Sequence, residues 1–565
     1  MVHDVRQNVT DSCPDVILYG GKVITVDARF SIAQAIAVTG DTFSAVGPDA
    51  AVLAQAGDDT KMIHLAGRTV IPGIIDAHFR LLDRALAQLH GADISLAESV
   101  ADILDAVRDR ARRLPPGAVV TSNAGWYPYT LKENRAPTRE ELDRAAPHHS
   151  VVLSGEFHYL NSHALRRFGI TRTTPQPDYG WIEKDPHSHE PSGVLMGDAA
   201  AVLVGSAHHD VTPDAKQAAL TWALKECAST GLTSVREGGL DHADLVHYQQ
   251  LAADNALPVR VSVQLAMSTA PPIESILARL ERFARTNPFG DHRLKVDRVA
   301  YLFADDDYHR MKVTPAIRNQ RVPASRVNRY FKDRCCPLEK IGQIVTAMAQ
   351  RGFSGGILAA GDRAIGDALK ILERANAEAD LTQRRWILSQ VPYPRVEHHA
   401  RMRDLGIVLT PMWHHYHYYP TLAHYHGTDF AQTMDPFRSL RAAGLRVGLG
   451  SDVSKIPLNY FEALSYLHTR QTHRWGPVNP TEAISREEAL RMLTIDNAYV
   501  TFDEDVKGSI EPGKLADLAI LNADPLRVPA EQIPSIRAVL TMVGGHVVHQ
   551  STDAPAALHA IPGRG

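Results

Sequence analysis

The order of apolar and polar segments predicts an α/β fold: a (β/α)8 TIM-like barrel with a composite β-sandwich built from the N- and C-terminal segments. The 565 residues are too many for one ordinary core but suit a large barrel and a second domain. Short β-rich runs occur at both ends, and helical and strand patterns alternate between them. We expect a tail over residues 1–14 and a composite β-sandwich built from 15–70 and 507–550. The barrel, with insertions, should cover 71–506, and a second tail 551–565.

The composition is that of a globular, enzyme-sized chain. It is 44% hydrophobic and 22% charged, and its net charge of −4 gives no general attraction to nucleic acid or anionic membranes. It has no run of about 18 apolar residues and no N-terminal apolar core of signal-peptide length. The four cysteines lack metal-type spacing. We expect a cytoplasmic protein that binds a small-molecule substrate and does not contact nucleic acid or membrane. A homodimer is one oligomeric state open to it.

The sandwich is expected to begin with two short strands in residues 15–26. These β-rich runs flank Gly20-Gly21, which is a hairpin pattern. Similar runs return at 516–521 and 538–548. We therefore expect the two ends of the chain to build one sandwich.

Helix boundaries in the barrel region have clear signals. Ser99 precedes a segment whose apolar residues follow helical spacing. Thr212-Pro213 begins another helix, and residues 232–235 have the pattern of the strand that follows it. Ser485, with a glutamate three positions later, predicts a capping box.

Residues 69–80 carry the strongest indication of a site. An apolar run passes a Pro-Gly turn and ends in His78, Phe79 and Arg80. Side chains alternate along a strand, so His78 and Arg80 should point to one face and Phe79 to the other. We expect the first barrel strand here, with both polar residues delivered to the catalytic mouth.

This stretch resembles the Pro-Gly-x-x-Asp-x-His-x-His signature of the metal-dependent amidohydrolase superfamily, in which both histidines bind a catalytic metal. Further ordered motifs resemble its amidohydrolase-3 subgroup, which includes N-substituted formamide deformylases. The resemblance also implies a composite small domain beside the barrel. The motifs that carry it lie at Trp126, 142–147, 151–153, 157–162, 361–364, 450–452 and 508–518.

Most positions that the resemblance assigns to metal ligands carry other residues here. Arg80 replaces the second histidine, and a guanidinium has no lone pair to donate. Tyr301 corresponds to a lysine, and Leu358 and Ser389 to two further histidines. His78 and Asp452 keep metal-binding chemistry, which is fewer donors than a Zn²⁺ site needs. We therefore expect no metal in this site and no cofactor.

Two interpretations of Arg80 stay open. In one, Arg80 and Asp452 form a structural ion pair. In the other, Arg80 binds a substrate carboxylate or oxyanion where the metal would be, so that the substrate can be anionic. The second interpretation gives Asp452, His78 and Arg80 as the catalytic residues, with His78 or another histidine moving a proton.

A segment rich in histidine and tyrosine follows the strand pattern at 407–411. Its five histidines and four tyrosines between 413 and 426 could form a relocated metal site, an acid/base set or an aromatic box, with packing as the simpler explanation. From here we expect substrate contacts by one or two of Trp413, His414, His415 and His417. The remaining substrate-binding candidates are Trp126, His158 and Tyr301.

Basic residues crowd the segment 310–334. Such a run is typical of a solvated insertion, and an acidic substrate or a subunit contact is the alternative.

The resemblance implies hydrolysis of an amide-like C–N bond in a small organic molecule. The altered site equally favours metal-independent lyase, decarboxylase, isomerase or cyclase chemistry. The alternatives are a catalytically inactive barrel that binds a ligand or an assembly partner, and a hydrolase with a relocated metal in the histidine segment at 414–426.

Overall fold

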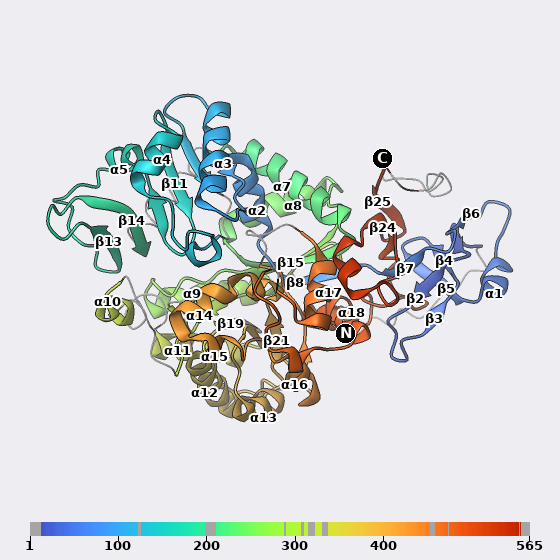
Figure 1. The fold of residues 1–565 in the computed structure, drawn as a ribbon. Coiled ribbons are helices and arrows are strands. Elements are labelled where there is room, and N and C mark those ends of the chain that lie inside the picture. The colour runs from blue at the N-terminus through green and yellow to red at the C-terminus, as the bar shows by residue number, and fades with distance from the viewer. Residues whose placement is uncertain are drawn as a thin grey trace.

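The computed structural model of the protein describes residues 13–95, 97–122, 126–197, 211–286, 290–306, 310–314, 322–329, 337–452, 458–472, 474–552 and 554. Most of the two expected tails therefore lies outside the described residues. Figure 1 shows strands β2–β7, β24 and β25 with helix α1 on the right of the view, and the other labelled strands and helices to their left.

Strands from both ends of the chain share one sheet, in the order β25-β24-β23-β7-β2-β3. The central pair is antiparallel, with Ile71 opposite Ala519. A second sheet, β5-β4-β1-β6, packs on it through a common core that contains Leu18, Ile36 and Leu540. The strands of the first sheet are β2 (Lys22–Ile24), β3 (Ile32–Ala33), β7 (Thr69–Pro72), β23 (Leu518–Leu521), β24 (Ala538–Val543) and β25 (His546–Gln550). Those of the second are β1 (Val16–Tyr19), β4 (Ala35–Thr39), β5 (Thr42–Gly47) and β6 (Lys61–His64), next to helix α1 (Asp49–Leu53).

The hairpin expected in residues 15–26 is wrong. β1 pairs with β4 and β6, whereas β2 pairs with β3 and β7, so the two runs lie in different sheets. Gly20 and Gly21 form the crossing between the sheets, where a Cβ on Gly21 would lie 2.5 Å from Leu65 Cδ1. Both runs are mostly buried, and their partners come from distant segments, which a local turn pattern does not reveal.

Two parallel sheets hold the central region, in the orders β17-β16-β15-β8 and β18-β19-β20-β21-β22. Their edges meet where Ala77 N donates to Leu449 O at 3.2 Å and Ser451 N donates to His78 O at 3.1 Å. This arrangement establishes an α/β fold with mixed sheets and is compatible with the expected barrel. The strands are β8 (Ile74–Phe79), β15 (Leu232–Leu240), β16 (Arg260–Leu265), β17 (Leu294–Arg298), β18 (Tyr301–Phe303), β19 (Gly356–Ala359), β20 (Ile387–Gln390), β21 (Val408–Pro411) and β22 (Arg446–Val447).

Helices alternate with these parallel strands. The caps predicted at Ser99, Thr212 and Ser485 are confirmed, because each side chain accepts a hydrogen bond from the third backbone N–H beyond it. They begin α3 (Val100–Arg113), α7 (Pro213–Ser229) and α18 (Arg486–Leu493). Other helices of this region are α2 (Leu81–His90), α8 (Leu245–Ala253), α9 (Ile273–Thr286), α10 (Ala324–Arg329), α11 (Leu338–Gln350), α12 (Asp362–Glu378), α13 (Val396–Asp404), α14 (Tyr419–His426), α15 (Thr428–Ala431), α16 (Phe437–Ala442), α17 (Tyr460–Thr469) and α19 (Ile495–Val500).

Residues 91–197 build a further sheet between β8 and β15 in the sequence, in the order β13-β14-β12-β11-β10-β9. Figure 1 shows it at the upper left, with α3, α4 (Arg139–Ala145) and α5 (Ser162–Arg167). The sequence pattern did not separate this sheet from the barrel. Its strands are β9 (Gly91–Ala92), β10 (Val119–Ser122), β11 (Ser150–Ser154), β12 (His158–Leu160), β13 (Gly180–Lys184) and β14 (Pro191–Gly197).

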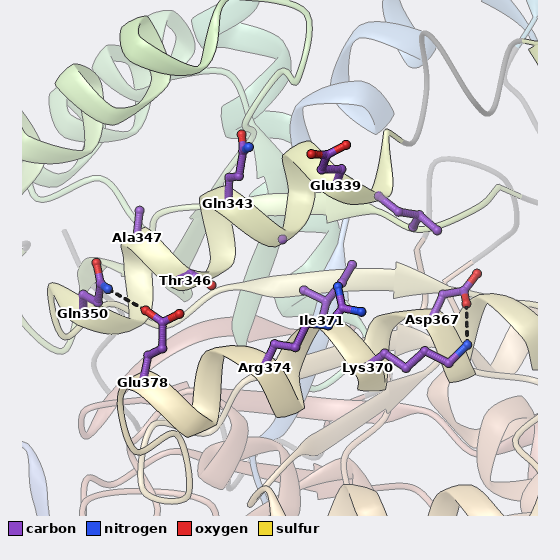
Figure 2. Close-up of a pocket in the computed structure, with 12 residues that line it drawn as sticks. Glu339, Gln343, Thr346, Ala347, Gln350, Asp367, Lys370, Ile371, Arg374 and Glu378 are labelled. Atoms are coloured by element: carbon purple, nitrogen blue, oxygen red, sulfur yellow. Dashed lines mark hydrogen bonds and ion pairs between the residues drawn. The ribbon is translucent and has the colours of Figure 1, made fainter.

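An open groove of about 860 Å³ lies between α11 and α12 (Figure 2). It is lined by residues of these two helices. Along it Lys370 Nζ lies 3.2 Å from Asp367 Oδ1, and Gln350 Nε2 donates to Glu378 Oε2 at 2.8 Å. Its described lining residues belong to these two helices and not to the strand ends, where catalytic residues of an α/β fold are expected, so this groove is not the candidate site.

Within the part of the chain that the structure describes, no helix is both long enough and apolar enough to cross a membrane.

Candidate functional site

The carboxyl ends of β8 and β20, the first residue of β18 and the segment after β22 bring polar side chains together. The rings of His78 and Tyr301 lie 5.2 Å apart between centroids, and Tyr301 Oη is 2.9 Å from Ser389 Oγ. Asp452 faces this cluster: its Oδ1 lies 3.8 Å from His78 Nε2, and its Oδ2 accepts a hydrogen bond of 3.4 Å from Gln390 Nε2. The structure therefore gathers three of the predicted site residues, His78, Tyr301 and Asp452.

Two buried carboxyl groups hold the backbone on either side of His78. Asp76 accepts from the backbone N–H of His78 at 2.8 Å and from Tyr460 Oη at 2.6 Å. Glu237 accepts from the N–H of Leu81 at 2.8 Å, at the first turn of α2. Burial raises the pKa of Asp76 to about 6 and that of Glu237 to about 7. These contacts fix the point at which the chain leaves β8 and enters α2.

His78 is a neutral imidazole at physiological pH. Its side chain is 2% exposed, and this burial lowers its pKa to about 3, against the opposing attraction of Asp452. A group with this pKa is a weak base near pH 7, and the single N–H of the neutral ring is too weakly acidic to act as a general acid. The geometry therefore favours His78 as a hydrogen-bonding or packing group rather than as the proton carrier expected from the sequence.

Arg80 is a fixed positive charge at the edge of the same cluster. Its Nε lies 3.0 Å from Asp83 Oδ2, and its Nη1 donates to Gly238 O at 2.7 Å. Asp83 and, less strongly, Asp452 raise its pKa. Asp83 rather than Asp452 is thus its ion-pair partner, so the structural Arg80–Asp452 pair is not the described arrangement. The side chain is 32% exposed, and Nη2 has no protein partner among the described residues.

Two glycines let the strands pack directly on His78. A Cβ on Gly238, in β15, would lie 2.7 Å from both ring nitrogens of His78, and a Cβ on Gly450 would lie 2.6 Å from His78 Cβ. Such distances are shorter than van der Waals contact, and the buried ring has little room to move. The imidazole position therefore depends on the absence of side chains at both glycines.

Gly238→Ala is expected to destabilise the fold by about 1–3 kcal/mol, the usual scale of overpacking a filled core. Urea unfolding followed by circular dichroism measures this change. Gly342→Ala, on α11, is the matched control: a Cβ there meets no atom within 4 Å, so added helix propensity should leave stability equal or higher by up to about 1 kcal/mol. Equal stability of the two variants would contradict the close packing around His78.

Two histidines after β21 contact residues that adjoin the site, Gln390 and Ser451. His415 Nε2 lies 2.7 Å from Gln390 Oε1, and its Nδ1 lies 3.2 Å from Asp435 Oδ1. His414 Nδ1 lies 2.5 Å from the carbonyl oxygen of Ser451. Both are buried, in the 3-10 helix Trp413–Tyr418. They support the strand ends that carry Gln390 and Asp452.

The other candidates of this segment pack against neighbouring rings. Trp413 is fully buried in the main core, next to Tyr416, whose ring also lies 4.1 Å from His417. His424 stacks on Tyr129 at 3.8 Å. Among the described side chains, no three of His, Cys, Asp and Glu lie close enough together to hold a metal ion.

Trp126 and His158 belong to the 91–197 sheet region. Trp126 is 2% exposed, and its ring lies 5.1 Å from that of Tyr159. His158 Nδ1 lies 3.3 Å from Ser154 Oγ, and burial together with the charge of Arg310 lowers its pKa to about 4. Tyr159 and Ser154 belong to the same sheet region, and the substrate contacts expected for Trp126 and His158 stay a prediction.

The described part of the basic segment makes contacts within the chain. Arg310 forms an ion pair of 2.8 Å with Asp306. Arg326 donates to Pro177 O at 2.8 Å, and Arg329 lies 5.5 Å from the ring of Tyr179, which attaches α10 to the 91–197 region. Lys312 is also described, and its backbone N–H donates to Asp305 Oδ2 at 2.9 Å. The remaining basic residues of this run, Arg318, Arg321, Lys332 and Arg334, lie outside the described residues.

Gln390 and Asp435 contact the site although no sequence motif predicted them. Gln390 follows Ser389 at the end of a predicted strand, so its position was a usable signal, whereas no pattern marks Asp435. Gln390 and Asp452 have φ angles of +70° and +46°. A left-handed backbone in residues other than glycine costs of order 1–3 kcal/mol and is found mainly at functional sites.

Comparison with known proteins places this geometry in a family. A model described as "Amidohydrolase family" matches residues 61–549. The chain is 28% identical to the N-substituted formamide deformylase of Arthrobacter pascens, over 96% of this chain and 99% of that protein. It is 25% identical to the putative amidohydrolase YtcJ of Bacillus subtilis (strain 168), over 95% of this chain and 99% of that protein.

The fold also matches solved structures. An uncharacterised metal-dependent hydrolase from Pyrococcus horikoshii OT3 superimposes with a TM-score of 0.69, over 91% of this chain and 99% of that chain. Its sequence identity is 18%, so this similarity speaks for the fold alone.

Proposed function

Because the chain belongs to the amidohydrolase family, we propose that it is an enzyme that cleaves an amide-type C–N bond of a small organic molecule. In this proposal Asp452 moves the proton, and Arg80 stabilises negative charge on a carbonyl oxygen. The observation that carries the proposal is the position of the Asp452 carboxyl group. It is 14% exposed, accepts a hydrogen bond from Gln390, and lies close enough to Arg80 to raise the pKa of that guanidinium.

The chemistry of Arg80 supports its role. Two of its nitrogens are held by Asp83 and Gly238, which orients the guanidinium. Nη2 makes no hydrogen bond to a described residue, so it can donate to an oxygen atom of a ligand. A guanidinium also retains its charge at any working pH. A preoriented cation next to a developing oxyanion lowers the barrel enzyme's reaction barrier without further reorganisation.

The side chains that face the cluster do not fit a metal of the kind the family resemblance implies. The positions expected to supply ligands carry a guanidinium, a phenol, an isobutyl group and a hydroxyl, in Arg80, Tyr301, Leu358 and Ser389. Tyr301 and Ser389 are hydrogen-bonded to each other. A Zn²⁺ site requires three or more nitrogen, oxygen or sulfur donors in tight geometry. We therefore propose acid/base chemistry by the chain's own side chains.

This chemistry limits the reaction. A carboxylate with an ordinary pKa near 4 is a poor base for water, whose pKa is about 15.7. It removes a proton more easily from a C–H, N–H or O–H group that a neighbouring carbonyl has made acidic. Hydrolysis of the C–N bond is the reaction that the family implies, and a metal-independent lyase, decarboxylase, isomerase or cyclase reaction is the alternative that the altered side chains favour.

The proposal is tested with a panel of N-alkyl and N-aryl formamides, chosen because one relative is an N-substituted formamide deformylase. Formate release and mass spectrometry of the reaction mixture together detect hydrolysis and other changes at the C–N bond. We expect turnover of at least one panel member. Binding of panel members without conversion would instead support a barrel that binds its ligand and does not act on it.

Purified protein is expected to contain no stoichiometric metal in this site and to keep its activity after dialysis against a chelator. The reason is that Arg80, Leu358 and Ser389 occupy positions where the resemblance expects histidine ligands, and none of them supplies an imidazole nitrogen. Elemental analysis checks the metal content, and an activity assay before and after dialysis checks the second point. About one zinc per chain that survives dialysis, or an activity that the chelator removes, would support the relocated metal site in the histidine segment instead.

A further inference from the structure

We propose that Gln390 is a positioning residue that orients the Asp452 carboxylate, and that the buried pair of Asp435 and His415 fixes the direction of its amide. The inference rests on the proposed role of Asp452. It adds Gln390 and Asp435, which neither the sequence motifs nor the family resemblance identified, and it gives His415 a role other than substrate contact.

An unbroken line of polar contacts runs from the core to the cluster. Asp435 Oδ1 lies 3.2 Å from His415 Nδ1, and His415 Nε2 lies 2.7 Å from Gln390 Oε1. Gln390 Nε2 then donates to Asp452 Oδ2 at 3.4 Å, while Asp452 Oδ1 faces His78 Nε2 at 3.8 Å. Each carboxyl oxygen of Asp452 thus faces a different neighbour, which sets the plane of the carboxylate.

The far end of this line is rigid. Asp435 is 1% exposed, and its second carboxyl oxygen accepts from Tyr466 Oη at 3.2 Å. Its backbone N–H donates to Pro392 O at 2.8 Å, two residues beyond Gln390. The anchor is therefore attached to the same loop that carries the amide.

The amide of Gln390 has one favourable direction. Its NH₂ group has hydrogen atoms for the carboxylate of Asp452, and its carbonyl oxygen accepts a hydrogen from His415 Nε2. The reverse direction would place the carbonyl oxygen against a carboxylate, where two acceptors repel. In this direction His415 Nε2 is the donor to the amide oxygen, and Nδ1 of the same ring faces the carboxyl group of Asp435.

Backbone geometry provides a separate observation. Gln390 and Val391 have φ angles of +70° and +49°, and Asp452, at the other end of the hydrogen bond, has +46°. Residues other than glycine keep such conformations only when the surroundings hold them there, and these cluster at functional sites. Both ends of the Gln390–Asp452 contact thus have the unfavourable backbone that a positioning contact explains.

The first experiment uses the full-length protein and needs no substrate. Labelling the histidine rings with ¹⁵N shows a protected Nε2–H resonance of His415, assigned by its loss in His415→Asn. We expect Gln390→Met to shift or abolish this resonance, because the acceptor is gone, and Gln390→Glu to retain it, because a carboxyl oxygen still accepts. Gln432→Met is the matched control: that half-buried glutamine also makes two hydrogen bonds, to Tyr419 and Asn479.

The second experiment measures kcat and KM across pH with the panel substrate found above. We expect Gln390→Met to lower kcat by about tenfold to a hundredfold at every pH, with KM nearly unchanged. A glutamate at this position can donate to Asp452 only when it is protonated, and its neighbour Asp452 favours that form. Gln390→Glu should therefore lose activity at neutral pH and regain part of it as the pH falls, relative to the wild type.

The outcomes separate the two proposals. A His415 resonance that is unchanged in Gln390→Met overturns the positioning role whatever the activity. The same pH profile in Gln390→Met and Gln390→Glu also overturns it. An altered resonance with no activity on any panel member leaves the hydrogen-bond line in place and counts against the proposed function alone.

Discussion

Asp452→Asn is expected to lower turnover of the panel substrate by about 100-fold or more, the scale of losing a positioned acid/base group. The asparagine keeps the shape of the side chain and can still accept from Gln390 Nε2, but it cannot take up a proton. Steady-state kinetics with the purified variant measure the loss, which should fall on kcat more than on KM. Arg80→Met should produce a loss of similar size, because the charge next to the carbonyl oxygen disappears.

Both variants need a demonstration that they fold, by circular dichroism and thermal unfolding. Asp367→Asn provides the matched control: this aspartate pairs with Lys370 in the groove of Figure 2, on the outer helices. Its turnover should equal that of the wild type. Near-normal turnover of both Asp452→Asn and Arg80→Met would place the chemistry elsewhere, with His414, His415 and His417 as the next residues to test.

A chain that ends at Val506 is expected to lose cooperative folding. The truncation removes β23, β24 and β25, so β7 loses its antiparallel partner. It also removes Asp517, which holds the buried Arg260 by contacts of 2.8 and 3.0 Å. An unpaired buried charge alone costs about 3–5 kcal/mol, against a total stability of about 5–15 kcal/mol for a typical domain.

Circular dichroism and calorimetry of the truncated chain check this expectation, with a chain that ends at Ala554 as the control. The control keeps every described strand and should melt as the full-length protein does. Native-like spectra and one sharp transition in the chain that ends at Val506 would show that the N-terminal strands do not depend on the C-terminal ones.

The sequence determined the class of the fold and the local helix boundaries. Alternating helix and strand patterns predicted an α/β fold, which the family match and the parallel sheets confirm. The caps at Ser99 and Ser485 formed as expected, because a capping box is built from residues three positions apart. The sequence also placed His78 near the end of a strand, and it is the second-last residue of β8; its catalytic role stays a prediction.

The tertiary structure decided which distant segments meet. Gly20-Gly21 had the local pattern of a hairpin, but β1 and β2 found partners in two different sheets. In the site, burial lowers the pKa of His78 to about 3 and removes it as a base near neutral pH, which no residue pattern reports. Asp435 and Gln390 are 45 residues apart in the chain and are joined by the side chain of His415 and by the backbone contact between Asp435 and Pro392. Strand pairing, desolvation and side-chain hydrogen bonds all depend on the folded neighbourhood, so the sequence alone could indicate the strand ends but not the contacts between them.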